Sequence, residues 1–163
     1  MIAMWRKGAI AGTLVAMLLV APAALGDGFE EREVFVERAE PICKSNVLAN
    51  KRIFKGAKGE VKAGKLKLAS RHFLRAATAF EKTIKQLEGV PPPPADTAKL
   101  NKWFGLLRQE KLLIEKIGNA LAAEEKHKAS SLSVDLNRNS TKANNAVLGF
   151  GFDYCRIEPS RFG

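Results

Sequence analysis

Apolar residues recur at steps of three and four along most of this 163-residue chain. That spacing is typical of amphipathic helices, and no alternating run with hairpin turns indicates a strand. The pattern predicts helices at about 30–55, 62–88, 97–126 and 132–148. Because each helix has one apolar stripe and the connections are short, we expect an all-α fold, an up-and-down four-helix bundle.

The helix over residues 62–88 has the clearest pattern and the clearest end. Gly89 follows it, and we expect this glycine to adopt the left-handed capping conformation while Val90 packs back on the helix. Four prolines, Pro91 to Pro94, come next and cannot continue a helix. The run predicts a short, stiff connector to the helix that Asp96 or Thr97 caps.

Three residues interrupt the other predicted helices. Pro41 lies inside the first helix, where proline removes a backbone donor, so we expect a kink or a new helix starting there. Gly105 and Gly118 lie inside the third helix. An interior glycine destabilises a helix, so these two predict close helix-helix contacts.

The N-terminus has the layout of a secretory signal peptide. A short positive stretch ends at Lys7, an uncharged run spans residues 8–24, and Ala24-Leu25-Gly26 offers a small-residue cleavage site. We expect a signal peptide over 1–26 and a helical domain over 27–163, in a protein that is secreted or associated with the cell envelope. The alternative is an uncleaved membrane anchor, although a spanning helix needs about 20 apolar residues.

Basic charge is concentrated in one part of the expected mature chain. Without residues 1–26 the chain keeps 25 basic and 17 acidic side chains, a balance of +8. Residues 51–75 alone carry +8, with Glu60 as their single acid. The nine basic residues, called here the basic segment, are Lys51, Arg52, Lys55, Lys58, Lys62, Lys65, Lys67, Arg71 and Arg75.

The basic segment predicts a salt-sensitive attraction for polyanions. Candidate partners are an anionic cell-envelope polymer, an anionic lipid surface and a protein partner. Single-stranded nucleic acid is not favoured, because Phe54 and Phe73 fall on core registers and leave no aromatic residues between the charges. The alternative is a solvated basic face that binds no specific ligand.

The chain has two cysteines, Cys43 and Cys155. An even pair in an exported protein predicts a structural disulfide. A redox or metal-binding thiol pair is the alternative, but the CxxC spacing and a neighbouring histidine are missing.

Glu124 and His127 have the Glu-x-x-His spacing of di-iron bundles. Such a site needs a second Glu-x-x-His, whereas the other histidine, His72, is flanked by Arg71 and Arg75. We therefore interpret 124–128 as an exposed charged helix end and expect no metal and no cofactor.

Several polar residues fall on apolar registers. Glu110 lies between Leu107 and Ile114, and we expect a snorkelling or salt-bridged carboxylate there rather than a buried acid. Asn46, Asn139 and Asn144 predict polar contacts within the bundle first and ligand contacts second. No triad or phosphate loop is present, so we expect a non-enzymatic binding module. The alternatives are a metal-binding redox bundle and a purely structural envelope protein.

Three motifs together carry a family resemblance. They are A-x-x-I-C over 39–43, L-x-x-V-P-P over 87–92 and G-F-x-x-C over 151–155. The chain resembles a group of uncharacterised secreted proteins and lipoproteins of high-GC Gram-positive bacteria. The resemblance implies a helical bundle with a bridge from Cys43 to Cys155 and implies no activity. This chain departs from the lipoproteins in lacking a lipid-accepting cysteine, and Pro41 replaces a residue that usually favours a helix.

Overall fold

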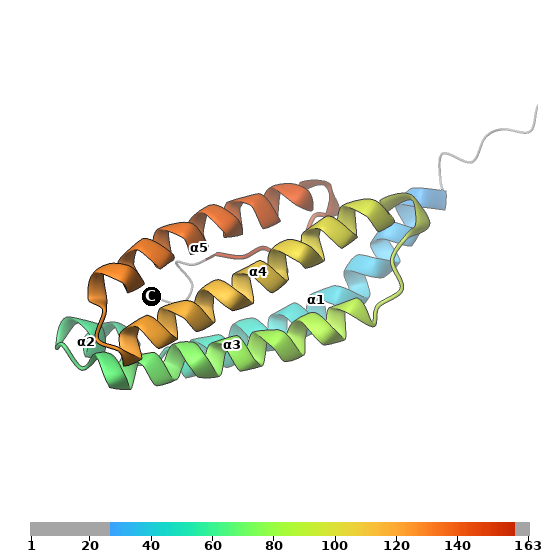
Figure 1. The fold of residues 1–163 in the computed structure, drawn as a ribbon. Coiled ribbons are helices and arrows are strands. Elements are labelled where there is room, and N and C mark those ends of the chain that lie inside the picture. The colour runs from blue at the N-terminus through green and yellow to red at the C-terminus, as the bar shows by residue number, and fades with distance from the viewer. Residues whose placement is uncertain (1–26, 159–163) are drawn as a thin grey trace, which may run out of the picture.

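The computed structural model describes residues 27–158, and these residues confirm the all-helical class. Their α-helices are α1 (Asp27–Ile53), α2 (Ala57–Lys62), α3 (Leu66–Glu88), α4 (Thr97–Ala122) and α5 (Lys126–Ala146), as Figure 1 shows. Two short 3-10 helices, Pro94–Asp96 and Leu148–Phe150, precede α4 and follow α5. No strand is present in this part of the chain.

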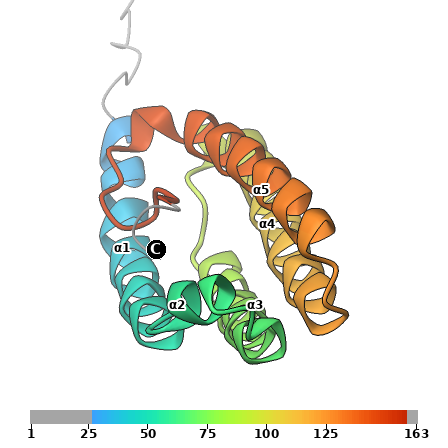
Figure 2. The ribbon, with the colours of Figure 1, turned by 90° about the vertical axis from the view of Figure 1, so that its left-hand side faces the viewer.

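The four long helices lie along a common direction, and α2 closes one end (Figure 1). α3 packs against both α1 and α4, and α4 packs against α5. Residues 151–158 run between α1 and α5 (Figure 2), two helices whose direct contact is slight at most. The C-terminal segment therefore takes the place of a direct α1–α5 interface.

The core has two hydrophobic clusters. The larger one is centred on Trp103, which is fully buried and stacks on Phe152 with a centroid distance of 5.5 Å. Phe35 and Phe150 extend this aromatic group. The smaller cluster joins the start of α3 to the end of α4 and the start of α5, through Leu66, Ala69, Ile117, Ala120, Leu121 and Ala129. Burying a side chain of leucine or phenylalanine size contributes about 1.5–3 kcal/mol, so these stripes hold the helices together.

The described residues form five helices where the sequence pattern predicts four. The additional helix, α2, lies between Gly56 and Gly64, whose φ angles of 92° and 72° are in the left-handed region that glycine tolerates. The last helix begins at Lys126 rather than near Leu132, because residues 123–125 alone make the turn after α4. The additional helix and the earlier start of the last helix both follow from the local conformation of the turns and not from the spacing of apolar residues.

The predicted interruptions have mixed outcomes. α1 continues through Pro41, so a new helix starting there is wrong. Gly89 has a φ of −78°, so the left-handed cap is also wrong, although Val90 is buried as expected. A Cβ on Gly118 would lie 2.9 Å from the Leu74 side chain, which confirms a close helix contact, whereas Gly105 faces open space and does not mark one.

The predicted signal peptide over 1–26 lies outside the described residues. Within 27–158, no helix combines the length and the apolar character needed to cross a membrane.

Candidate functional site

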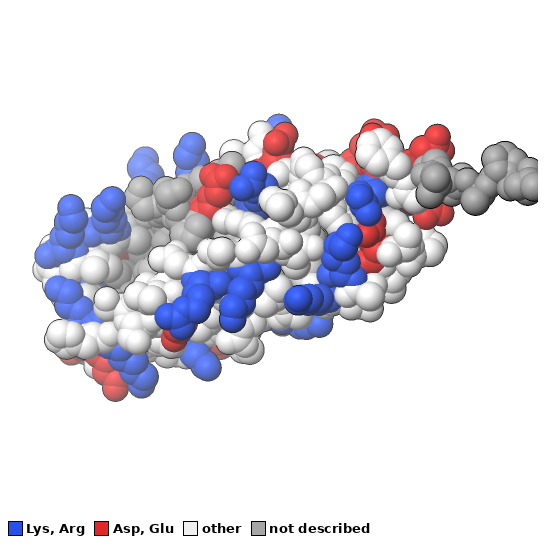
Figure 3. Space-filling model, turned by 90° about the horizontal axis from the view of Figure 1, so that it is seen from above, with Lys and Arg blue, Asp and Glu red and all other residues white. Residues whose placement is uncertain are grey.

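All nine residues of the basic segment are exposed. They lie on the end of α1, on α2 and its flanking turns, and on the first half of α3. Lys and Arg side chains gather at this end of the molecule in Figure 3, the end that α2 closes in Figure 1. Within 27–158, Lys67 is the one member with an ion pair, a contact of 3.6 Å with Glu124. The positive charge of this end is therefore largely uncompensated.

The single acid of the segment, Glu60, lies beside a histidine of α3. Its Oε2 lies 3.1 Å from Nε2 of His72 on α3, and both side chains are largely buried. The other ring nitrogen of His72, Nδ1, makes a hydrogen bond with the carbonyl oxygen of Ile53 at the end of α1. His72 on α3 thus contacts both the end of α1 and α2.

A cavity of about 480 Å³ lies inside this end of the molecule. Side chains from all five helices and from the C-terminal segment line it, and most of them are apolar, including Val47, Phe54, Val61, Phe73 and Ile114. Phe54 and Phe73 meet edge to face with a centroid distance of 5.0 Å. The volume falls in the range of small-molecule sites, about 300–1,000 Å³.

The exposed part of the cavity lining, called here its mouth, is cationic. Of its lining residues, Lys58, Lys62 and Arg156 are exposed, and all the others are buried or half-buried. Two of the three belong to the basic segment on α2, and the third comes from the C-terminal segment. The fold therefore brings residues almost 100 positions apart in the sequence to one opening.

Three polar atoms in the cavity wall have no hydrogen-bond partner among the described residues. They are Oδ1 of Asn46, Oδ1 of Asn50 and Nε1 of Trp103. Asn50 is 5% exposed and Trp103 is 0% exposed. A buried polar group without a partner costs about 1–3 kcal/mol, so such groups call for a ligand or ordered water. The expectation of an intramolecular contact does not hold for Oδ1 of Asn46.

Glu110 also lines the cavity and is buried, 2% exposed. The expected snorkelling or salt-bridged carboxylate is wrong, because the α4 register points this side chain at α5. There Asn139 Nδ2 donates to Glu110 Oε2 at 2.6 Å and to the Leu106 carbonyl oxygen at 2.9 Å, as the prediction of a polar bundle contact for Asn139 requires. Ser140 Oγ contacts Glu110 Oε1.

Burial raises the pKa of Glu110, and the hydrogen bonds with Ser140 and Asn139 only partly oppose this. The Ser140 hydroxyl also lies 2.9 Å from the Leu136 carbonyl oxygen, but it has one hydrogen to donate. A protonated Glu110 donates to Ser140 Oγ while Ser140 donates to Leu136, whereas an ionised Glu110 accepts from Ser140. Both protonation states are therefore hydrogen-bonded, and burial favours the neutral one.

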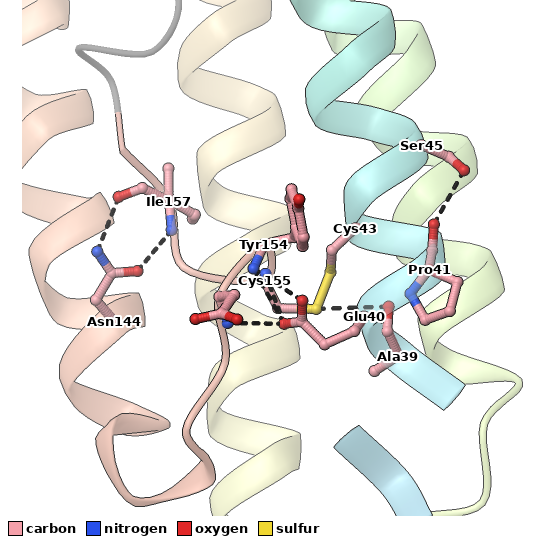
Figure 4. Close-up of a disulfide and its surroundings, with 10 residues drawn as sticks. Ala39, Glu40, Pro41, Cys43, Ser45, Asn144, Tyr154, Cys155 and Ile157 are labelled. Carbon is pink, nitrogen blue, oxygen red and sulfur yellow. Dashed lines mark hydrogen bonds between the residues drawn. A yellow bond between two sulfur atoms is a disulfide. The ribbon is translucent and has the colours of Figure 1, made fainter. Parts of the chain in front are cut away.

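Cys43 and Cys155 form a disulfide, the predicted pairing, with sulfur atoms 2.01 Å apart and Cα atoms 5.0 Å apart (Figure 4). Beside it, Asn144 of α5 makes two hydrogen bonds of 2.8 Å with the backbone of Ile157. This contact agrees with the prediction of a bundle contact for Asn144. The C-terminal segment is thereby fixed to α1 on one side and to α5 on the other, which positions Arg156 at the cavity mouth.

Asp96 anchors the start of α4, although not as the side-chain cap that the sequence predicts. Its carboxylate accepts hydrogen bonds from Arg32 Nε at 2.6 Å and from Lys99 Nζ at 2.9 Å. The Arg32 hydrogen bond is the main reason that the pKa of Asp96 lies below its ordinary value, and burial opposes the shift. This contact joins α1 to α4 at the end opposite the cavity mouth.

The weak metal candidates, Glu124 and His127, lie on different elements. Glu124 lies in the turn between α4 and α5 with a φ of 60°, and His127 is exposed in the first turn of α5. The two residues therefore do not share a helix face, which the Glu-x-x-His argument requires. Within 27–158, no group of three or more His, Cys, Asp or Glu side chains could hold a metal ion.

The sequence pointed to two of the three mouth residues and, among the unpartnered groups, to Asn46 as a second-choice ligand contact. Arg156, Asn50 and Trp103 carry no motif, and each contributes to the cavity only through the packing of α1, α4 and the C-terminal segment. The position of Asn50 within the apolar stripe of the first helix was the one sequence feature that could have indicated its buried polar group. The chain matches no protein-family model, no curated protein and no solved structure.

Proposed function

We propose that this chain is an exported, non-enzymatic binding protein whose basic segment adsorbs to an anionic lipid surface. One observation carries the proposal: nine basic side chains are exposed at one end of the molecule, and Lys67 is the one member with an ion pair in the described chain. Anionic membranes attract such clusters by about 1 kcal/mol per Lys or Arg near the surface.

Two exposed leucines favour a lipid surface over a soluble polymer. Leu48 on α1 is 48% exposed and Leu68 on α3 is 42% exposed, and both lie in helices that carry basic-segment residues. Apolar side chains next to lysines add buried area at a membrane interface, which a hydrated polyanion does not supply. The lack of any catalytic motif in the sequence supports a binding role.

Export is part of the proposal. The disulfide between Cys43 and Cys155 supports it, because such bonds persist mainly in oxidising compartments outside the cytoplasm. The resemblance to secreted proteins and lipoproteins agrees with export and adds no ligand. The intact mass of the protein recovered from its host tests this point: we expect a chain beginning at Asp27 and two hydrogens short of the reduced mass. A mass that includes residues 1–26 contradicts cleavage.

We also interpret the framework as an up-and-down four-helix bundle built from α1, α3, α4 and α5, with α2 added to the first connection. The packing of α3 on α1 and α4, and of α4 on α5, supports this topology.

Vesicle sedimentation tests the lipid proposal. The protein should sediment with vesicles of phosphatidylglycerol and phosphatidylcholine but not with phosphatidylcholine alone. The bound fraction should fall as salt rises from about 0.05 to 0.5 M, since screening shortens the Debye length. The triple variant Lys62→Glu, Lys65→Glu and Lys67→Glu should weaken adsorption by about tenfold or more.

A matched variant separates the basic segment from net charge. Lys82, Lys102 and Lys116 are exposed and lie outside the segment, so changing all three to glutamate alters the net charge equally. This variant should keep most of the adsorption. An equal loss in both variants would overturn the proposal. Binding to isolated cell-wall polymer without binding to vesicles would replace the lipid surface with a polymer.

A further inference from the structure

The cavity under the basic segment has an amphiphilic lining. Its walls are mostly apolar and come from every helix, whereas its three exposed lining residues are Lys58, Lys62 and Arg156. A ligand complementary to this arrangement has a hydrocarbon part and one anionic end. Adsorption to a membrane surface does not require this cavity, because the other residues of the basic segment do not line it.

The wall also contains residues with hydrogen-bonding atoms that no group in 27–158 pairs with. Asn50 is 5% exposed and Trp103 is 0% exposed, yet Asn50 Oδ1 and Trp103 Nε1 have no partner in the described part of the chain. Protein interiors are normally close-packed with satisfied polar groups, and an empty apolar cavity is destabilising. The two features together point to an occupant rather than to a packing defect.

We propose that the cavity binds one single-chain amphiphile, with its acyl chain against the apolar wall and its carboxylate or phosphate at Lys58, Lys62 and Arg156. Charge complementarity selects the anionic head, and charge-assisted hydrogen bonds from lysine and arginine hold it. The volume of about 480 Å³ suits one small ligand. This site goes beyond adsorption to a surface and does not depend on it.

Trp103 provides a direct reporter. The chain has two tryptophans, Trp5 and Trp103, so Trp5→Phe leaves the cavity residue as the sole tryptophan, which is excited selectively over tyrosine, whether or not the signal is removed. The probes are a fatty acid and a lysophosphatidylglycerol, each with a brominated acyl chain, below their micelle concentrations. Bromine quenches indole emission at close range. Saturable quenching at one probe per chain is expected, and the probe with the higher affinity identifies the head group as carboxylate or phosphate.

A fatty alcohol with the same brominated chain tests the cationic mouth. The anionic probes should bind about tenfold more tightly than the alcohol, because Lys58 and Arg156 act on charge. The double variant Lys58→Glu and Arg156→Glu should remove this preference and leave the alcohol affinity unchanged. The matched variant Lys55→Glu and Arg71→Glu makes the same charge change outside the cavity and should keep the preference.

Filling the cavity tests its apolar wall. Val47→Phe and Val61→Phe each add volume at half-buried lining positions and should abolish saturable quenching by both anionic probes. Circular dichroism and the melting temperature identify a variant that fails to fold, and the other variant then decides. Unchanged quenching in a folded filled variant would overturn the site.

Two further variants separate this site from competing explanations. Lys65→Glu with Lys67→Glu should reduce vesicle adsorption while leaving probe binding intact, because neither residue lines the cavity.

A variant that ends at Glu158 tests whether the last five residues compete for the space. Quenching that appears only in that shortened chain would make the chain's own end the occupant and overturn the proposal. No quenching in either chain would also overturn it.

Discussion

The carboxylate of Glu40 accepts the backbone N–H of Tyr154 at 2.9 Å, across 114 positions of sequence. The same carboxylate accepts the N–H groups of Asp153 at 3.0 Å and Cys155 at 3.2 Å. Figure 4 shows this contact beside the disulfide, so α1 holds the C-terminal segment by one covalent bond and one carboxylate. This contact holds the C-terminal segment in place and so positions Arg156 at the cavity mouth.

Glu40→Ala should lower the free energy of unfolding by about 1–3 kcal/mol, because several backbone N–H groups lose their acceptor. Urea unfolding measures the loss, and hydrogen exchange at residues 153–155 should accelerate. Glu37→Ala is the matched control, since Glu37 is exposed on the same helix and should change stability by less than about 0.5 kcal/mol. Equal losses in the two variants would contradict the assigned contact.

The free energy of unfolding of the Glu110→Gln variant should rise relative to that of the parent protein as pH rises. Because burial raises the folded-state pKa of Glu110, the folded protein binds this proton more tightly than the unfolded chain does. Its contribution is therefore fully present below about pH 4 and is lost as pH rises through the raised pKa, by up to about 1.4 kcal/mol per pH unit. Glutamine keeps an acceptor for Asn139 and a donor for Ser140 at every pH.

Urea unfolding of both proteins from about pH 4 to pH 8 checks this prediction. A stability difference that does not change with pH would show that Glu110 is ionised in the fold without penalty.

Asp96→Asn should have the opposite pH dependence. The folded-state pKa of Asp96 is lowered, chiefly by the hydrogen bond from Arg32, so its stabilisation is present above about pH 4 and lost as pH falls through the lowered pKa. At pH 7 the variant should lose roughly 1.5–3 kcal/mol, the contribution of charge-assisted hydrogen bonds to a buried group.

Asp135→Asn is the control for Asp96, because Asp135 pairs with Arg138 on the surface of α5. Such exposed pairs contribute about 0–1 kcal/mol. Thermal and urea unfolding at pH 7 and pH 3 should show a gap between parent and Asp96→Asn that narrows in acid. A gap that widens in acid would reverse the assignment.

Gly118→Ala and Gly105→Ala should change stability in opposite directions, although both glycines lie in α4. A Cβ at residue 118 would lie 2.9 Å from Leu74, and overpacking of this kind costs about 1–3 kcal/mol. Residue 105 faces open space, where alanine stabilises a helix by about 0.5–1 kcal/mol. Melting temperatures compare the two directly, and a stabilising Gly118→Ala would show that α3 and α4 are less closely packed than described.

The sequence determined the helical class, most helix positions and the basic segment, because these follow from local spacing and local charge. The stripe on α3 needed no tertiary information, and Cys43 and Cys155 have only each other as partners. Local reasoning was wrong at Gly89 and Gly105, where neighbouring helices and connectors decide the conformation and the packing.

Only the tertiary structure decided which side chains Glu110 contacts and whether a cavity forms. A register position says that a side chain faces inward, but whether it meets a lysine or Asn139 depends on which helix lies opposite. The mouth combines Lys58 and Lys62 of α2 with Arg156, whose position depends on Glu40, Asn144 and the disulfide. No pattern along the chain encodes such a meeting, because it arises from long-range contacts that form only when the helices pack.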